Sequence, residues 1–127
     1  MPGIFISYRR EDTAGYAGRV SDRLSQRFGS EKIFIDVDTI EPGEDFVEAI
    51  EEKVGICDAL VALIGKDWLD CKNEGGTRRL DDPNDFVRLE VLAALSRNVR
   101  VIPVVLEGAR MPRLQDLPEP LVPLARR

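Results

Sequence analysis

Gly3-Ile4-Phe5-Ile6-Ser7-Tyr8-Arg9-Arg10 is the stretch of this chain that decides the fold. Its apolar first half, with Ile and Phe, predicts a buried β-strand from residue 3 to residue 8. A helical pattern follows from about residue 14, with apolar residues at helical spacing as far as Phe28 and a glycine to end it. The two arginines therefore stand between a strand and a helix, where α/β folds bind anionic ligands.

The rest of the chain repeats this alternation. Further strands are predicted at 32–36, 59–64 and 100–106, and helices at 14–28, 45–54 and 84–97. We expect Asp12 or Thr13 to cap the first helix and Pro83 to suit the first turn of the last one. The pattern is typical of the α/β class, with a flavodoxin-like parallel sheet of four to five strands and helices on both faces.

Length and composition exclude several classes of protein. The 127 residues suffice for one domain, which we assign to residues 1–110. The Pro-rich segment 111–127 is expected to be an irregular connection or a linker. With 18 basic and 23 acidic residues, the net charge of −5 disfavours binding to nucleic acid or to an anionic membrane.

Cysteine and histidine usage limits the chemistry. Two cysteines, Cys57 and Cys71, have no metal-type spacing and are too few for a disulfide framework, and no signal peptide or membrane-spanning run is seen. We therefore expect a cytoplasmic, reduced protein with inert cysteines. The absence of histidine excludes catalytic triads and HExxH zinc sites. Any catalysis must use carboxylates, hydroxyls, Lys, Arg or the backbone.

A single carboxylate, Glu90, interrupts the apolar segment 86–92 of the last predicted helix. Parallel sheets bind ligands at the carboxyl ends of their strands, which here carry residues 7–12, 36–43 and 65–68. The helix of Glu90 starts from that same edge, so we expect Glu90 and the two arginines to share one cleft. The alternative is that Glu90 is a solvated charge on an exposed helix face.

Three segments resemble the signature boxes of TIR domains, the Toll/interleukin-1 receptor family. The first box is similar to Phe5-Ile6-Ser7-Tyr8-Arg9-Arg10. The second box and its loop resemble Phe34-Ile35-Asp36-Val37-Asp38 and Ile40-Glu41-Pro42-Gly43. The helix that carries the glutamate of enzymatic members resembles Asp85-Phe86-Val87-Arg88-Leu89-Glu90. The double arginine and the spacing of Arg88 and Glu90 look most like bacterial members and enzymatic animal ones.

The resemblance implies an NAD+ nucleosidase that cleaves the nicotinamide–ribose bond and gives nicotinamide with ADP-ribose or a cyclic ADP-ribose. NAD+ is then the substrate, no cofactor or metal is expected, and the partners are other TIR domains in a homo-oligomer or filament. Likeness to bacterial members implies a role in antiviral defence or signalling. It also implies that the family's last strand and helix lie beyond this chain.

The same resemblance assigns roles to individual residues. Glu90 would be the catalytic carboxylate, and Phe86 stands where enzymatic members often carry Trp. Arg9 and Arg10 suit the phosphates of the dinucleotide, since guanidinium groups match phosphate oxygens. The expected NAD-binding residues are Arg9, Arg10, Glu41, Tyr8, Trp68 and Phe86, with Tyr8 and Trp68 as candidates for stacking on a base.

Other interpretations stay open at this point. The arginines can instead pair with Glu11 or Asp12, Asp36 and Asp38 can simply cap turns, and Trp68 can be a packing residue. For the whole domain, the alternative is a non-enzymatic TIR–TIR interaction or scaffold module. A phosphoacceptor domain that uses Asp67 is disfavoured, because no Lys follows the last predicted strand.

Overall fold

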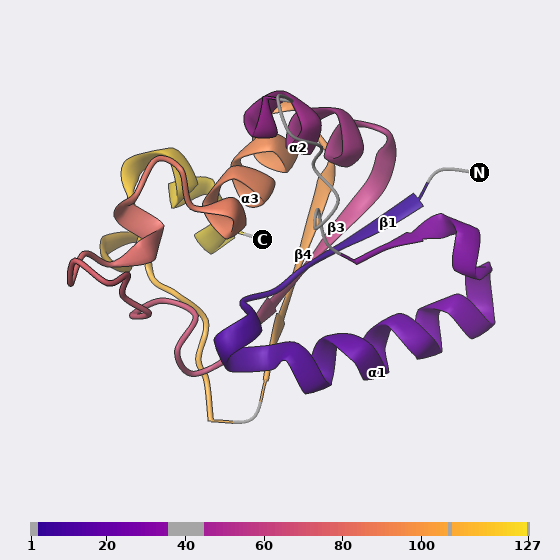
Figure 1. The fold of residues 1–127 in the computed structure, drawn as a ribbon, viewed down its shortest axis with the longest axis horizontal. Helices are drawn as coiled ribbons and strands as arrows, with labels where there is room; N and C mark the ends of the chain where they lie inside the picture. Colours follow the sequence, from indigo (N-terminus) through magenta and orange to yellow (C-terminus); the bar gives the residue numbers. More distant parts are fainter. Residues whose placement is uncertain (1–2, 36–44, 107, 127) are drawn as a thin grey trace.

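The computed structural model describes residues 3–35, 45–106 and 108–126. Strands and helices alternate along most of the chain, with several short 3-10 helices (η) between them (Figure 1). In chain order the elements are β1 (Gly3–Ser7), α1 (Arg10–Phe28), η1 (Ser30–Lys32), β2 (Ile33–Phe34), α2 (Phe46–Gly55), β3 (Cys57–Ile64), η2 (Arg79–Asp81), α3 (Phe86–Ser96), β4 (Arg100–Val105), η3 (Leu114–Asp116) and η4 (Glu119–Arg126).

The strands of the described residues form one parallel sheet in the order β2-β1-β3-β4. β1 therefore lies inside the sheet, and its last residue, Ser7, is paired in register with Ala62 of β3. β3 is buried from Leu60 to Ile64, which explains its continuous apolar run, because a strand covered on both faces has no solvent side. The predicted α/β fold class with a parallel sheet is confirmed.

Helices cover the sheet on both faces, with α1 on one face and α2 and α3 on the other (Figure 1). The alternation of side chains along β1 follows this division. Ile6 packs in the cluster under α1, whereas Phe5 packs in the larger cluster with Ile50 of α2 and Val91 of α3. Ser7 has the parity of Phe5, so its side chain points to the layer of α2 and α3. This parity brings the end of β1 to α3.

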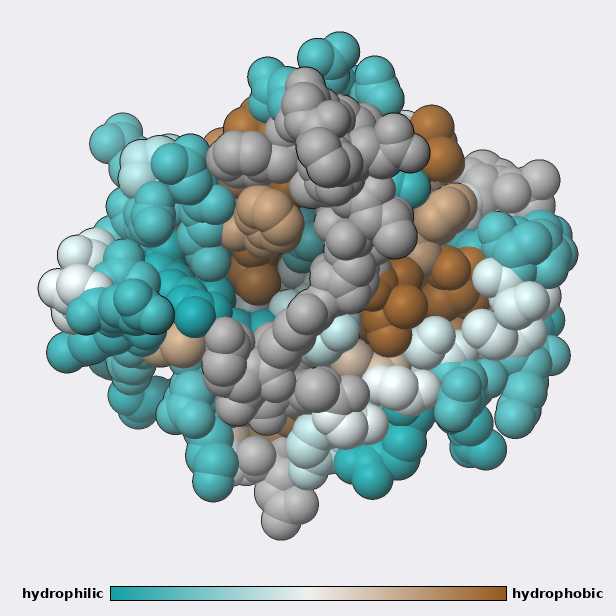
Figure 2. All heavy atoms as spheres, in the orientation of Figure 1, coloured by the Kyte–Doolittle hydropathy of each residue, from teal (hydrophilic) through white to brown (hydrophobic). Residues whose placement is uncertain are grey.

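The surface matches this arrangement. Hydrophilic side chains cover most of the periphery in Figure 2, and hydrophobic residues show in several separate places between them. No helix within the described ranges is long and apolar enough to span a bilayer.

The helix starts differ from those predicted. α1 begins at Arg10, so the expected cap at Asp12 or Thr13 is wrong, and Arg9 occupies the N-cap without a side-chain cap bond. α3 begins at Phe86 after an Asp85 cap, which leaves Pro83 before the helix. The residue directly before each helix occupies the N-cap, and of the two only Asp85 caps with its side chain. Gly29 ends α1 as predicted, with a φ of 97° that suits glycine.

The C-terminal segment, which was expected to be an irregular connection or a linker, contains η3 and η4 and packs on the domain. Leu117, Leu121 and Leu124 are buried in the cluster that α2 and α3 form on the sheet. In Figure 1 the segment, in yellow, lies against α3. The interpretation as a linker therefore does not describe residues 117–124, since a linker would leave these leucines in water.

Candidate functional site

The candidate site is centred on Glu90, at the point where α3 crosses the carboxyl end of β1. Glu90 is 4% exposed and Ser7 is 1% exposed, and the Ser7 hydroxyl donates a hydrogen bond of 2.8 Å to Oε1 of Glu90. Glu90 is therefore not a solvated charge on an exposed helix face. A carboxylate loses much of its hydration when it is buried, and such residues concentrate at functional sites.

A second contact joins the same two elements. The Arg9 terminal nitrogens Nη1 and Nη2 donate to the Asp85 oxygens Oδ1 and Oδ2, each at 3.0 Å. Arg9 is 2% exposed and the Asp85 side chain 8%, so this is a buried, two-pronged ion pair. The Asp85 Oδ2 atom also accepts a bond of 3.1 Å from the backbone N–H of Arg88, which caps α3. The carboxylate thus serves the helix N-terminus and the guanidinium together.

These contacts bring the opening strand and the Glu90 helix together at one edge, as the sequence led us to expect. They also give Arg9 a partner that the sequence did not indicate. Arg9 was expected to meet a ligand phosphate, or else Glu11 or Asp12, whereas its terminal nitrogens hold Asp85. Its role towards phosphate stays a prediction. The side chain of Arg10 and all of Glu41 lie outside the described residues.

The aromatic candidates fall in different places. Trp68 is 0% exposed and belongs to the core cluster, so its assignment as a stacking platform is wrong, because no ring surface is available to a ligand. The Tyr8 ring packs in the cluster under α1, on the other face of the sheet from Glu90. Phe86 is 41% exposed and one helical turn before Glu90, on the same face of α3. Of the three, Phe86 alone combines exposure with nearness to Glu90 along the helix.

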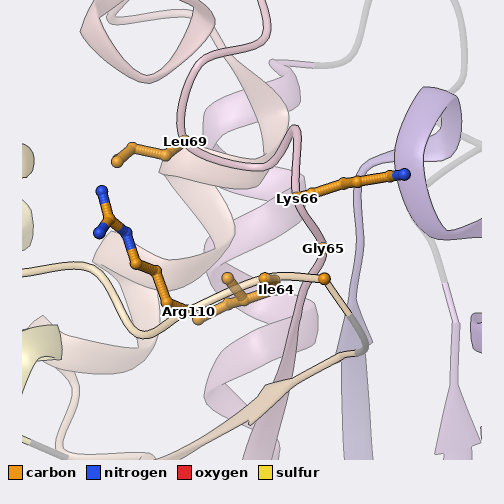
Figure 3. A pocket seen from close by; sticks show the side chains of 7 residues that line it. Ile64, Gly65, Lys66, Leu69 and Arg110 are labelled. Atoms are coloured by element: carbon orange, nitrogen blue, oxygen red, sulfur yellow. The ribbon is translucent and has the colours of Figure 1, made fainter.

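A hollow of about 260 Å³ lies along the same sheet edge, between the turn after β3 and the segment after β4 (Figure 3). Glu90 does not line it. Lys66 and Arg110 border it from two sides and point in different directions, and Leu69 contributes an apolar wall. Two basic residues thus border the hollow at this edge of the sheet. The sequence places residues 65–68 at this edge, but it did not indicate that Lys66 or Arg110 would border a hollow there.

Hydrogen bonds fix the long loop before α3 and so support the start of that helix. Arg88 donates from Nη1 to the Leu80 carbonyl at 2.9 Å. Arg78 pairs with Asp81 and also donates to the Asp116 carbonyl at 2.7 Å, which ties the loop to the C-terminal segment. The Arg78 bond holds the pKa of Asp81 below its usual value.

The cysteines and acidic groups do not extend the site. Burial, with a smaller effect from Asp58, raises the pKa of the Cys57 thiol to about 11, so the thiol is protonated and unreactive at neutral pH. Within the part of the chain that the structure describes, no three Cys, Asp or Glu side chains gather as metal ligands would. Among the described residues, the chemistry that this edge can support therefore rests on Glu90.

Comparison with known proteins identifies relatives of the whole domain. A model of the TIR domain family matches residues 4–125. NAD(+) hydrolase sarm1 of Drosophila melanogaster is 30% identical over 117 residues, which is 91% of this chain and 8% of that protein. This chain thus spans a small part of that relative.

Two solved structures share the fold. The TIR domains in the activated Roq1 resistosome that recognises the pathogen effector XopQ superpose with a TM-score of 0.63 at 15% identity, covering 99% of this chain and 70% of that one. A metazoan TIR-STING receptor from C. gigas gives a TM-score of 0.60 at 22% identity, covering 98% of this chain and 36% of that one.

Proposed function

This chain belongs to the TIR domain family, and we propose that it is an NAD+ nucleosidase that cleaves the nicotinamide–ribose bond. One observation carries the proposal: the Glu90 carboxylate is buried at the carboxyl edge of the sheet and held by the Ser7 hydroxyl. The similarity to a protein named NAD(+) hydrolase supports the choice of substrate. The products are nicotinamide and ADP-ribose, or a cyclic ADP-ribose.

The reaction suits a chain without histidine. When the bond between ribose C1′ and the pyridinium nitrogen breaks, the electron pair stays on nicotinamide, which leaves as a neutral molecule and needs no proton from an acid. Positive charge develops on the ribose, as in other glycoside cleavage. An ionised carboxylate beside the ribose stabilises that charge. Water then adds to C1′ and releases a proton to solvent, or a nitrogen of the adenine adds and closes a ring.

Binding of the dinucleotide requires positive charge near Glu90. We assign the phosphates to Arg10, and Lys66 and Arg110 add positive potential along the same edge. Arg9 contributes chiefly by its ion pair with Asp85, which fixes the start of α3. Glu41 and Phe86 complete the proposed site, with Phe86 as an apolar wall one turn before the carboxylate.

Activity is proposed to depend on assembly with other TIR domains. One of the structural neighbours is a resistosome in which TIR domains are assembled, which supports this part of the proposal by fold alone. The isolated domain should then be weakly active when dilute, and activity per molecule should rise with concentration. A role in antiviral defence or signalling in the cytoplasm would follow from the likeness to bacterial members.

The second candidate function is a non-enzymatic interaction module. The observation that favours it is the Arg9–Asp85 pair. Arg9 was expected to bind a phosphate of NAD+, but its terminal nitrogens donate to Asp85 within the fold. In that case the buried polar contacts would serve stability alone, and the domain would bind other TIR domains without consuming NAD+.

Incubation of the concentrated domain with NAD+, with products resolved by chromatography, separates the two functions. Glu90→Gln keeps the size of the side chain and its ability to accept from Ser7, but it removes the charge. We expect this variant to lose nicotinamide release by at least about 100-fold, because the ribose cation loses its counter-charge. Glu52→Gln, on the exposed face of α2, is the matched control and should remain active. A wild-type domain that releases no nicotinamide even when clustered would leave the interaction module as the function.

A further inference from the structure

The hydroxyl that holds Glu90 belongs to a residue to which sequence reasoning gave no role. Ser7 and Glu90 are 83 positions apart, and both side chains are buried. A hydrogen bond to an ionised oxygen in such surroundings is stronger than one in water, because the local dielectric constant is low. The contact is therefore a defined feature of the folded domain.

Ser7 is a fixed donor. It is the last residue of β1, an interior strand, and it is paired with Ala62 of β3, so its backbone position is set by the sheet. Its side chain is short and has one rotatable bond. Glu90, by contrast, reaches its carboxylate through three rotatable bonds, so a donor at Oε1 selects one orientation from several.

The helix that carries Glu90 is fixed at its start as well. Arg9 lies two residues after Ser7 and binds Asp85, five residues before Glu90. The end of β1 thus holds α3 at two points, one at the N-cap and one at the carboxylate. The ion pair sets where the helix begins, and the hydroxyl sets where the Glu90 oxygens lie.

We propose that Ser7 is a positioning residue, which orients the Glu90 carboxylate towards the ribose. This inference rests on the proposed nucleosidase activity. It differs from a merely structural role, in which Ser7 only satisfies a buried oxygen. A positioning residue affects the rate of bond cleavage more than it affects substrate binding or folding.

The test compares Ser7→Ala, Ser7→Thr and Ser96→Ala in the same assembled domain. Ser7→Ala removes the donor, whereas Ser7→Thr keeps the hydroxyl and adds one methyl group that suits a strand. Ser96 is the matched control: its hydroxyl donates to the Leu92 carbonyl at 2.9 Å, on the same helix but at the end away from the site. For each variant kcat and KM for NAD+ are measured, and Tm is measured by circular dichroism.

We expect Ser7→Ala to lower kcat by roughly 10- to 100-fold with KM within about threefold of wild type, as is typical when a reacting group is displaced by about 1 Å. Ser7→Thr should restore kcat to within about threefold, and Ser96→Ala should match wild type. A crystal structure of Ser7→Ala should show the Glu90 carboxylate turned away from its wild-type position.

Two results would overturn the inference while leaving the proposed function intact. One is a Ser7→Ala domain with wild-type kcat, and the other is a loss of activity that only follows the loss of folded protein. Both results count against the inference only when the wild type is active and Glu90→Gln is inactive. If the wild type itself releases no nicotinamide, the proposed function fails, and the positioning role fails with it.

Discussion

The Asp85 carboxylate both caps α3 and pairs with Arg9, and replacement by asparagine separates these two roles. Asn is about as good an N-cap as Asp, so the helix start should survive in Asp85→Asn. The ion pair does not survive, and Arg9, which is 2% exposed, loses the Asp85 carboxylate in a place with little access to water. The perturbation therefore tests the buried charge pair rather than the helix cap.

The expected cost follows from that burial. Removing one partner of a buried ion pair destabilises a protein by about 3–5 kcal/mol, because the other charge stays desolvated. For a domain of 127 residues, each kcal/mol lowers Tm by about 4 °C, so Tm should fall by roughly 12–20 °C. Arg9→Met keeps much of the side-chain volume and should be destabilising for the same reason, since Asp85 then remains buried with its charge. The double variant should be less destabilised than the sum of the single ones.

The assay is urea unfolding of the wild type, both single variants and the double variant, followed by circular dichroism. The double-mutant cycle gives the coupling energy between the two side chains, which we expect to exceed about 1.5 kcal/mol for a close buried charge pair. A coupling energy below about 0.5 kcal/mol, or an Asp85→Asn domain as stable as wild type, would refute the reasoning. The pair would then behave as a surface salt bridge does.

Two further predictions concern residues away from the ion pair. Trp68 is the only tryptophan and is fully buried, so its fluorescence should be blue-shifted, resist quenching by acrylamide and stay constant on addition of NAD+. Trp68→Phe should lower the free energy of unfolding by about 1–2 kcal/mol and leave NAD+ cleavage per folded molecule unchanged. A loss of activity without a loss of stability would show that Trp68 takes part in NAD+ binding. Because the pKa of Cys57 is raised to about 11, its thiol stays protonated at pH 8, and iodoacetamide should label it only as the pH approaches that value. Peptide mass spectrometry measures this, and equal labelling of Cys57 and Cys71 at pH 8 would contradict it.

The fold could be predicted from the sequence because its signals are local. The apolar run of β3 and the helical spacing in α1 each depend on residues near one another in the chain. The alternation of strands and helices then restricts the sheet to a parallel one, and it places the strand ends at one edge. That topology permits Glu90 to lie near the end of β1, and the hydrogen bond from Ser7 shows that it does.

The partners within the site could not be predicted in the same way. The sequence offers Arg9 several acidic neighbours, and nothing local indicates that a carboxylate 76 positions away receives its nitrogens. The role of Ser7 had one usable signal, the shared parity with Phe5, which directs both side chains to the layer of α3. The prediction that Trp68 stacks on a base was wrong because an aromatic residue in a polar loop can either cover the core or face a ligand. The geometry of the loop decides between these two positions.

The two ends of the Ser7–Glu90 bond are made at different times on the ribosome. Strand β1 leaves the exit tunnel early, and the helix that completes the site follows more than eighty residues later. Contacts between such distant segments form late in folding, because a long loop must close first. A half-made copy therefore carries the serine without the glutamate, and a locally unfolded copy carries both residues without the bond between them, so the site is complete only when synthesis and folding of both segments are finished.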